Sequence, residues 1–131
     1  MTEPVWLSAE TVVYINERVV TRTGEPFLLR DRGLLESALA KPRNEFFYRN
    51  VEDVASLATT LLFGIARNHP FAQGNKRTGF LSAVDFLEIN GYRIDVSDDE
   101  FLLGRLIVEV LEQKLDEARF ADILRSLIHA I

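Results

Sequence analysis

Residues of the types that bind phosphate and move protons gather in one short stretch, from residue 69 to residue 78. It reads His-Pro-Phe-Ala-Gln-Gly-Asn-Lys-Arg-Thr, and the apolar spacing after it predicts a helix that begins near Asn75. A helix start is already positive, so a cation there costs about 0.3–1 kcal/mol. Lys76 and Arg77 nevertheless stand in the first turn, which favours a bound anion. With Gly74, whose backbone is free to approach a ligand, they predict a phosphate cradle.

A possible proton acceptor stands at the beginning of the same stretch. His69 precedes Pro70, and proline biases the residue before it toward extended backbone, so we expect His69 to leave the preceding helix and face the loop. Neutral imidazole, with an ordinary pKa of about 6.5, accepts a proton from an attacking hydroxyl near pH 7. Arg77 offers a planar fork and Lys76 a mobile point charge, which fits a polyphosphate such as ATP. These residues predict phosphoryl or nucleotidyl transfer, with Phe71 as a core anchor of the loop.

The charges of the whole chain limit its partners. The 131 residues carry a formal net charge of −5, which disfavours direct binding to nucleic acid. No Asp or Glu occurs between Val54 and Val84, so the cations of the loop form a positive locus in an acidic protein. The chain has no cysteine, no secretory leader pattern and no apolar run of membrane-spanning length. We therefore expect a cytoplasmic protein without a membrane contact.

The elements that position the loop are expected to be helices. Apolar residues recur at helical spacing along nearly the whole chain, which predicts an all-α fold: one compact domain over residues 1–131, a bundle of about six helices. Capping residues predict where most of these helices begin: Ser8, Asp31, Asp53 (or Val51), Ser97 and Asp116. Gly24 and the pair Asn90-Gly91 predict two helix ends, and the last helix is expected to include Ile128.

One connector is expected to be non-helical. Pro42 should end the second helix, because its ring cannot continue the hydrogen-bond ladder. The aromatic residues that follow favour extended backbone. They are Phe46, Phe47 and Tyr48. We expect them to form either a short flap before the third helix or an anchor in the core.

The stretch from residue 69 to 78 resembles the signature of the Fic/Doc superfamily, a His-x-Phe-x-acid-Gly/Ala-Asn-x-Arg loop between two central helices. It is most similar to the Doc (death-on-curing) branch, because Lys76 stands where AMP-transferring Fic proteins usually have Gly. The resemblance implies a toxin of a type II toxin–antitoxin system. Such a toxin transfers the γ-phosphoryl group of ATP to a threonine of elongation factor Tu and so inhibits translation. It also implies a Phd-like antitoxin whose segment lies in a groove over the active site.

The resemblance assigns a role to each residue that matches the motif. It implies that His69 is the general base. The nucleotide phosphates would be held by Gly74, Asn75, Lys76 and Arg77, the last three counted with His69 as catalytic. The expected flap, Phe46 to Tyr48, would align the target segment.

One residue departs from the family pattern. Gln73 stands where the family usually has an Asp or Glu that binds Mg²⁺, and a neutral carbonyl is a weaker ligand for this ion. Asp85 does not replace it, since it lies roughly 13 Å farther along the expected helix. Three interpretations stay open: Mg²⁺ held by ATP with Gln73 assisting, transfer without metal, or a catalytically weak interaction module. We prefer the first. AMP transfer to a protein hydroxyl is a further alternative, and the sequence does not indicate an oligomeric state.

Overall fold

The structure, a computed structural model, describes residues 2–94 and 116–131, and these are mainly helical. The elements in chain order are α1 (Ala9–Thr23), α2 (Arg32–Arg49), α3 (Val54–Asn68), α4 (Asn75–Ile89), β1 (Tyr92–Ile94), α6 (Glu117–Leu127) and β2 (Ile128–Ala130). The predicted all-α class is confirmed. The helix expected after Ser97 lies outside the described residues. None of the described helices is both long enough and apolar enough to cross a bilayer.

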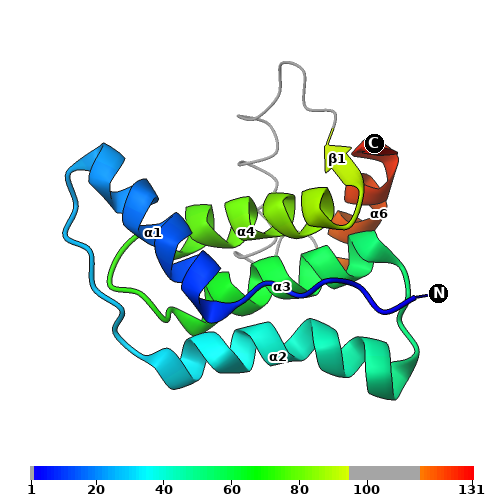
Figure 1. The fold of residues 1–131 in the computed structure, drawn as a ribbon, viewed down its shortest axis with the longest axis horizontal. Coiled ribbons are helices and arrows are strands. Elements are labelled where there is room, and N and C mark those ends of the chain that lie inside the picture. The colour runs from blue at the N-terminus through cyan, green and yellow to red at the C-terminus, as the bar shows by residue number, and fades with distance from the viewer. Residues whose placement is uncertain (1, 95–115) are drawn as a thin grey trace.

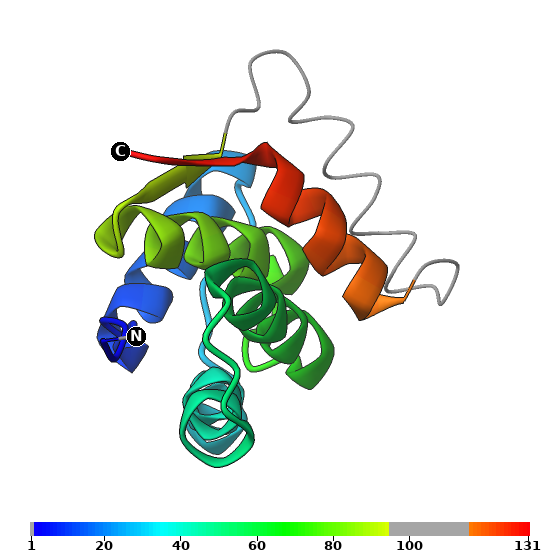
Figure 2. The same ribbon diagram turned by 90° about the vertical axis from the view of Figure 1, so that its right-hand side faces the viewer.

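Helices α3 and α4 form the centre of the molecule. Figure 1 shows them one above the other, with α2 beneath α3, and Figure 2 shows α1 and α6 on opposite sides of this pair. Most residues of α3 are buried, as expected for a helix covered on several faces. The four largest fully buried side chains come from four different segments: Phe63, Phe71, Phe86 and Phe120. The loop between α3 and α4 therefore connects the two central helices of the fold.

Two glycines allow this close packing of helices. A Cβ atom on Gly79 of α4 would lie 2.7 Å from the carbonyl oxygen of Leu62 in α3, which is closer than real Cβ contacts. A Cβ atom on Gly64 of α3 would lie 3.4 Å from the carbonyl oxygen of Ala38 in α2. The backbone of α4 thus sits directly on α3, which fixes the separation of the two ends that the loop must join.

Four of the described helices begin where the sequence predicts. The side chains of their N-cap residues each accept a hydrogen bond from the backbone N–H three residues later: Ser8, Asp31, Asp53 and Asp116. Gly24 ends α1 in the left-handed conformation, with φ of 74°. Helix α4 differs, because its N-cap is Gly74 and no side chain caps it.

The expectations for the second helix are wrong at its C-terminal end. Pro42 does not end α2, which continues to Arg49, so Phe46, Phe47 and Tyr48 are helical and form no extended flap. A proline inside a helix costs about 3 kcal/mol, but Pro42 is buried and lies one turn after Ala38, whose backbone packs against Gly64 of α3. Phe46 also packs edge-to-face on Trp6, with ring centroids 5.9 Å apart. Tertiary packing therefore overrides both local preferences.

The C-terminal residues form a small strand that the sequence did not indicate. Strands β1 and β2 pair in antiparallel fashion, with Ile94 opposite Ile128 and Tyr92 opposite Ala130. Ile128, expected in the last helix, instead caps α6 and begins β2. Three-residue strands carry too short a pattern to be recognised by alternation.

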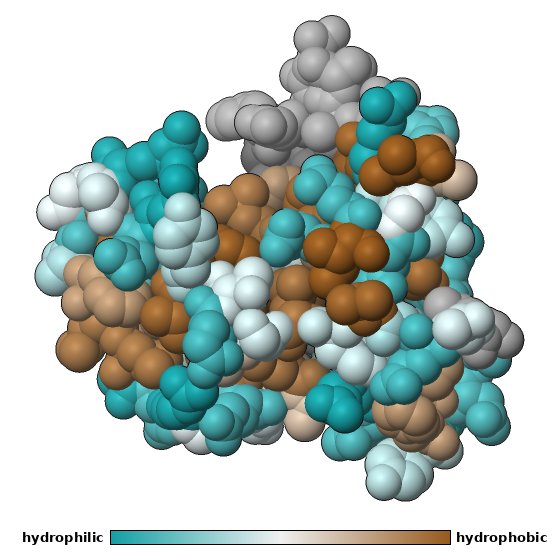
Figure 3. Space-filling model, in the orientation of Figure 1, coloured by the Kyte–Doolittle hydropathy of each residue, from teal (hydrophilic) through white to brown (hydrophobic). Residues whose placement is uncertain are grey.

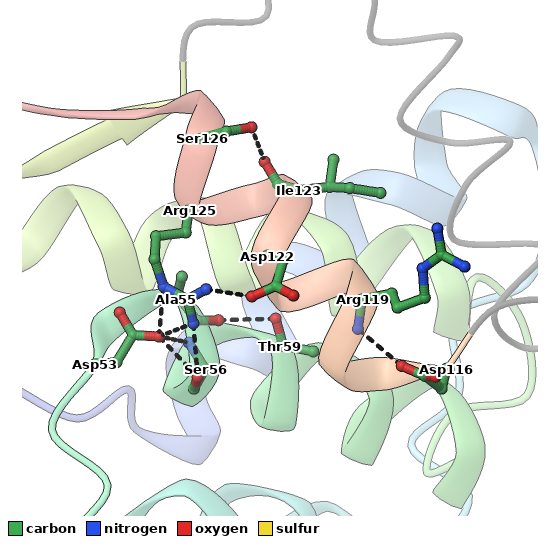
Figure 4. Close-up of polar contacts among 10 residues, drawn as sticks. All are labelled: Asp53, Ala55, Ser56, Thr59, Asp116, Arg119, Asp122, Ile123, Arg125 and Ser126. Atoms are coloured by element: carbon green, nitrogen blue, oxygen red, sulfur yellow. Dashed lines mark hydrogen bonds and ion pairs between the residues drawn. The ribbon is translucent and has the colours of Figure 1, made fainter.

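Helix α6 is tied to the start of α3 by a polar network, shown in Figure 4. Asp53 accepts hydrogen bonds from the backbone N–H of Ser56 at 3.0 Å and from its hydroxyl at 2.7 Å. Arg125 of α6 donates from Nε to Asp53 at 3.2 Å and also pairs with Asp122. Hydrogen bonding from Arg125, more than any other cause, lowers the pKa of Asp53 from 3.8 to about 2. The N-terminus of α3 is thus capped by a carboxylate that is itself paired within the protein.

Candidate active site

The loop from residue 69 to residue 74 is attached to the core by its aromatic residue. Phe71 is 1% exposed and belongs to the main hydrophobic cluster, as predicted. Pro70 before it is also buried, whereas Ala72 and Gln73 after it are exposed. The loop is therefore anchored at its middle and open to solvent on the side that leads into α4.

His69 ends α3 as its C-cap, and its side chain is exposed. The prediction that it leaves the helix is confirmed, but the expected extended backbone is wrong. Its φ of 50° and ψ of 53° place it in the left-handed region, which ends a helix by turning the chain sharply. Its ring nitrogen Nδ1 lies 3.4 Å from Nδ2 of Asn75, at the limit of a hydrogen bond. The imidazole thus borders the start of α4 and keeps access to solvent.

The side chain of Asn75 holds the shape of the loop. Its Oδ1 accepts from the backbone N–H of Phe71 at 3.0 Å, and its Nδ2 donates to the carbonyl of Phe71 at 2.8 Å. Asn75 is 7% exposed, so both bonds are shielded from water. The structure gives Asn75 a scaffold role that the sequence did not suggest, and its contact with a phosphate stays a prediction.

Lys76 and Arg77 are exposed in the first turn of α4, which contains no acidic residue. Among the described residues, no carboxylate lies within ion-pair distance of either cation. Gly74 before them has φ of 74°, and a Cβ atom there would approach Cγ1 of Val19 to 3.1 Å. Glycine is therefore required at this turn, and the helix start keeps its N–H groups and both cations free for an anion.

Gln73 contributes its backbone, not its side chain, to the described contacts. Its carbonyl accepts from Nδ2 of Asn16 at 2.8 Å, and the same nitrogen lies 3.0 Å from the hydroxyl of Thr78. Asn16 is fully buried in α1, so it fixes the exit of the loop against α4. In the described part of the chain, no three His, Asp or Glu side chains come together as a metal site. The residues around Gln73 thus fit a protein-held Mg²⁺ ion poorly.

A second segment lies along the loop and was missed by the sequence analysis. Residues 28–31, between α1 and α2, pair with residues 70–72 through an isolated antiparallel bridge between Leu29 and Phe71. The N–H of Ala72 donates to the carbonyl of Leu28 at 3.0 Å, and the N–H of Arg30 donates to the carbonyl of Pro70 at 2.8 Å. We call residues 28–31 the edge segment. Such non-local pairing has no local sequence signal.

The edge segment is bordered by exposed apolar side chains. Phe27 is 41% exposed and Leu28 is 56% exposed. Figure 3 shows apolar residues gathered over the connection between α1 and α2, at the left of the view. The predicted flap residues Phe46, Phe47 and Tyr48 lie near the far end of α2, away from the loop (Figure 1). The structure does not bring them together with His69.

A groove continues from the site between α1 and α4. Three arginines line it, Arg18 and Arg22 from α1 and Arg77 from α4, together with apolar side chains such as Leu81 and Val84. Because Arg77 belongs both to the groove and to the start of α4, a molecule in the groove would reach the first turn of this helix. The lining thus combines three arginines and one acid, Asp85, with apolar side chains.

Comparison with known proteins gives consistent results. The model of the Fic/DOC family matches residues 6–87, which is more than half of the chain. The protein kinase Doc of Escherichia phage P1 is 28% identical over 121 residues, covering 92% of this chain and 94% of that protein. The toxin Doc of Mycolicibacterium smegmatis is 35% identical over 97 residues, covering 71% of this chain and 72% of that protein. The matched range contains α1 to most of α4 and therefore the whole loop.

Proposed function

The chain belongs to the Fic/DOC family, in its Doc branch, and from this premise we propose that it is a toxin that phosphorylates a protein hydroxyl with ATP. The observation that supports this most is the uncapped start of α4. It presents Lys76 and Arg77 without a described acidic partner, directly beside the exposed His69. An anion site next to a proton acceptor is what phosphoryl transfer requires, because this reaction depends mainly on positioning and charge stabilisation.

Each residue of the site has a separate task in this proposal. ATP supplies the γ-phosphoryl group. The N–H groups at the start of α4, Lys76 and Arg77 hold the phosphate oxygens and offset their charge. His69 removes the proton from the target hydroxyl as its oxygen bonds to phosphorus, and ADP leaves with the electrons of the broken phosphorus–oxygen bond. Asn75 keeps His69 and the cations in register through its bonds to Phe71.

The target segment is proposed to dock on the edge segment. The bridge to the loop uses the carbonyl of Leu28 and the N–H groups of Arg30 and Asp31. The N–H and carbonyl of Leu29 have no partner among the described residues, so an extended peptide could add there as a further strand. Exposed Phe27 and Leu28 would contact its side chains. We propose elongation factor Tu, at a threonine, as the target, which places the action in the cytoplasm and inhibits translation.

The groove between α1 and α4 is proposed as the place where a Phd-like antitoxin binds. It is lined by Arg18, Arg22 and Arg77 with a single acid, Asp85, so its net positive charge suits an acidic segment, and apolar side chains complete the lining. A segment lying there would cover Arg77 and so block the phosphates from their site. The antitoxin would then inhibit the toxin both by blocking access of ATP and by offsetting the positive charge of the site.

The described residues fit a protein-held Mg²⁺ ion poorly, so none of these steps assigns the ion to a side chain. The position of the usual acid is taken by Gln73, whose backbone carbonyl is bonded to Asn16. Any Mg²⁺ in the reaction is therefore proposed to arrive on the triphosphate and not on the protein.

The assay that tests the proposal uses ATP labelled at either the α or the γ phosphate, with purified elongation factor Tu as the acceptor. Label from the γ position on the factor supports phosphorylation, whereas label from the α position means AMP transfer. The variant His69→Ala should lose about 10²–10⁴ of the rate, as expected when a general base is removed. Transfer from neither position, at any Mg²⁺ concentration, would favour the alternative of a catalytically weak interaction module.

A further inference from the structure

We infer that Arg30 is a positioning residue that holds His69 in its left-handed backbone conformation, an inference that rests on the proposed role of His69. The guanidinium of Arg30 donates two hydrogen bonds to one acceptor, the carbonyl oxygen of His69. Nε lies 3.2 Å from this oxygen, and Nη2 bonds to it as well. The contact joins residues 39 positions apart, from the edge segment to the end of α3. It therefore belongs to the tertiary structure and not to local helix termination.

The backbone of His69 needs such support. A non-glycine residue in the left-handed region is strained and persists only where its surroundings hold it there. His69 has φ of 50° and is followed by Pro70, whose ring further narrows the choices of the residue before it. Elsewhere in the described chain, Asn50 alone among non-glycine residues has positive φ, and no proline follows it. The conformation at His69 is thus the more strained of the two.

The ring of His69 depends on this backbone for its direction. The side chain is exposed, and its contact with Asn75 is 3.4 Å long, too weak to orient the imidazole alone. If φ and ψ of His69 relaxed toward the extended region, the Cα–Cβ bond would turn and carry the imidazole away from the start of α4. Arg30 therefore acts on the base through its main chain.

The edge segment holds two successive carbonyls of the loop. The side chain of Arg30 bonds the carbonyl of His69, while the N–H groups of Arg30 and Asp31 bond the carbonyl of Pro70 at 2.8 and 3.0 Å. The same residue thus fixes the carbonyls of the two peptide bonds on either side of Pro70. A target peptide that docks on the outer edge of this segment would tighten the contact that orients the base.

A direct role of Arg30 in phosphate binding predicts a different result. If its guanidinium held ATP, its removal would raise KM for ATP and leave kcat nearly unchanged. As a positioning residue, it should change kcat, because misplacing a catalytic group by about 1 Å costs up to about 100-fold in rate. The split between the two constants separates the roles.

The test compares Arg30→Ala and Arg30→Lys with a control, Arg43→Ala, an exposed arginine of α2 without a described bond. We expect Arg30→Ala to lower kcat by about 10- to 100-fold while KM for ATP changes less than about 3-fold. Arg30→Lys, which keeps one charged donor, should recover part of kcat. Arg43→Ala should match the natural protein. A normal kcat in Arg30→Ala would overturn the inference, as would a rise in KM alone.

A second readout does not depend on activity. The ¹³C chemical shifts of His69 Cα and Cβ in labelled full-length protein distinguish left-handed from extended backbone. We expect these shifts to move toward extended values in Arg30→Ala and not in Arg43→Ala. If no phosphoryl transfer is found in the natural chain, the proposed function fails, while this measurement still decides whether Arg30 holds His69. Unchanged shifts would refute the positioning role.

Discussion

Helices α3 and α4 differ in whether the protein itself balances the positive charge at their N-termini. At α3, the carboxylate of Asp53 caps the helix, bonds Ser56 and pairs with Arg125, so the positive end of the helix is neutralised within the protein. At α4, a glycine is the N-cap, no side chain caps the helix, and Lys76 and Arg77 add positive charge. The start of α3 is capped when the chain folds, whereas the start of α4 stays uncapped and positive, as the proposed anion site requires.

The difference indicates where the chain gives up stability for function. Four of the described helices begin with a capping side chain, which is worth about 0.5–2 kcal/mol each. Helix α4 lacks this contribution and also bears the repulsion between its cations and its own dipole. Local features that cost stability without a packing benefit are expected at functional sites. Charge changes at the two kinds of helix start should therefore affect ATP binding only at α4 and have similar consequences for stability.

The largest effect is expected from Arg77→Glu, compared with Arg119→Glu. Each arginine is the third residue of its helix, Arg77 in α4 and Arg119 in the capped α6. Both changes should raise the free energy of unfolding by up to about 1 kcal/mol, because they place an acid near a helix N-terminus. Only Arg77→Glu should weaken ATP binding, by about 100-fold, through loss of a charged hydrogen bond and gain of repulsion. Calorimetric titration and urea unfolding measure the two quantities, and equal loss of ATP binding in both variants would break the comparison.

Substitutions at the capped start of α3 should change the free energy of unfolding and not ATP binding. Asp53→Ala removes the cap of α3 and the partner of Arg125, so we expect a loss of about 2 kcal/mol in the free energy of unfolding. Asp122→Ala is the matched control, because it removes the other partner of Arg125 and leaves the cap, and it should cost at most about 0.5 kcal/mol. Urea denaturation gives both values. Equal losses would show that the ion pairs of Arg125, and not the cap, account for the stability at the start of α3.

A carboxylate beside the open helix start should create a metal dependence. Gln73→Asp places an acid next to the phosphate site, where it repels ATP alone and attracts Mg²⁺ bound to ATP. We expect Mg²⁺ to strengthen ATP binding to this variant by about 10-fold more than to the natural chain, which corresponds to about 1.4 kcal/mol. Gln73→Ala, which adds no charge, should behave like the natural chain. The same gain in all three proteins would mean that the side chain at this position does not contact the metal.

The smallest expected effect is a pH dependence of stability that arises from Asp53 at the start of α3. The folded protein holds the pKa of Asp53 at about 2, below its ordinary value of 3.8, so its ion pair stabilises the fold above about pH 4. This stability is lost as the pH falls from about 4 to 2. Both partners are more than a third exposed, so solvent screening reduces the contribution to about 1 kcal/mol. Urea denaturation at pH 5 and at pH 2.5 should show a smaller loss in Asp53→Asn, and an identical loss would contradict the assignment.

Local signals in the sequence predicted the helix starts correctly. Ser8, Asp31, Asp53 and Asp116 each bond a backbone N–H three residues away, so the information lies within one turn. Phe71 was also predicted correctly, since a large apolar residue in a polar loop has few places other than the core. The family was recognisable because the whole loop motif is contiguous in the chain.

Features that depend on distant contacts could not be predicted. Pro42 was expected to end the second helix, but packing against α3 outweighs the cost of the proline. The edge segment was missed because its pairing with residues 70–72 links positions about 40 residues apart. The scaffold roles of Asn16, Arg30 and Asn75 follow from hydrogen bonds to backbone carbonyls. The type of a residue does not indicate which carbonyl it will bond. The chemical roles of the loop residues stay predictions until the assays are done.

The measurement that tests the central claim most directly is calorimetric titration of the full chain with ATP, inorganic tripolyphosphate and adenosine, each with and without Mg²⁺. If the open start of α4 is a phosphate site, ATP and tripolyphosphate should bind and compete with each other, and adenosine should bind much more weakly. Their affinity should fall as salt rises, because the site consists of exposed cations. If neither ATP nor tripolyphosphate binds under any of these conditions, the uncapped helix start is not an anion site and the proposed function is wrong.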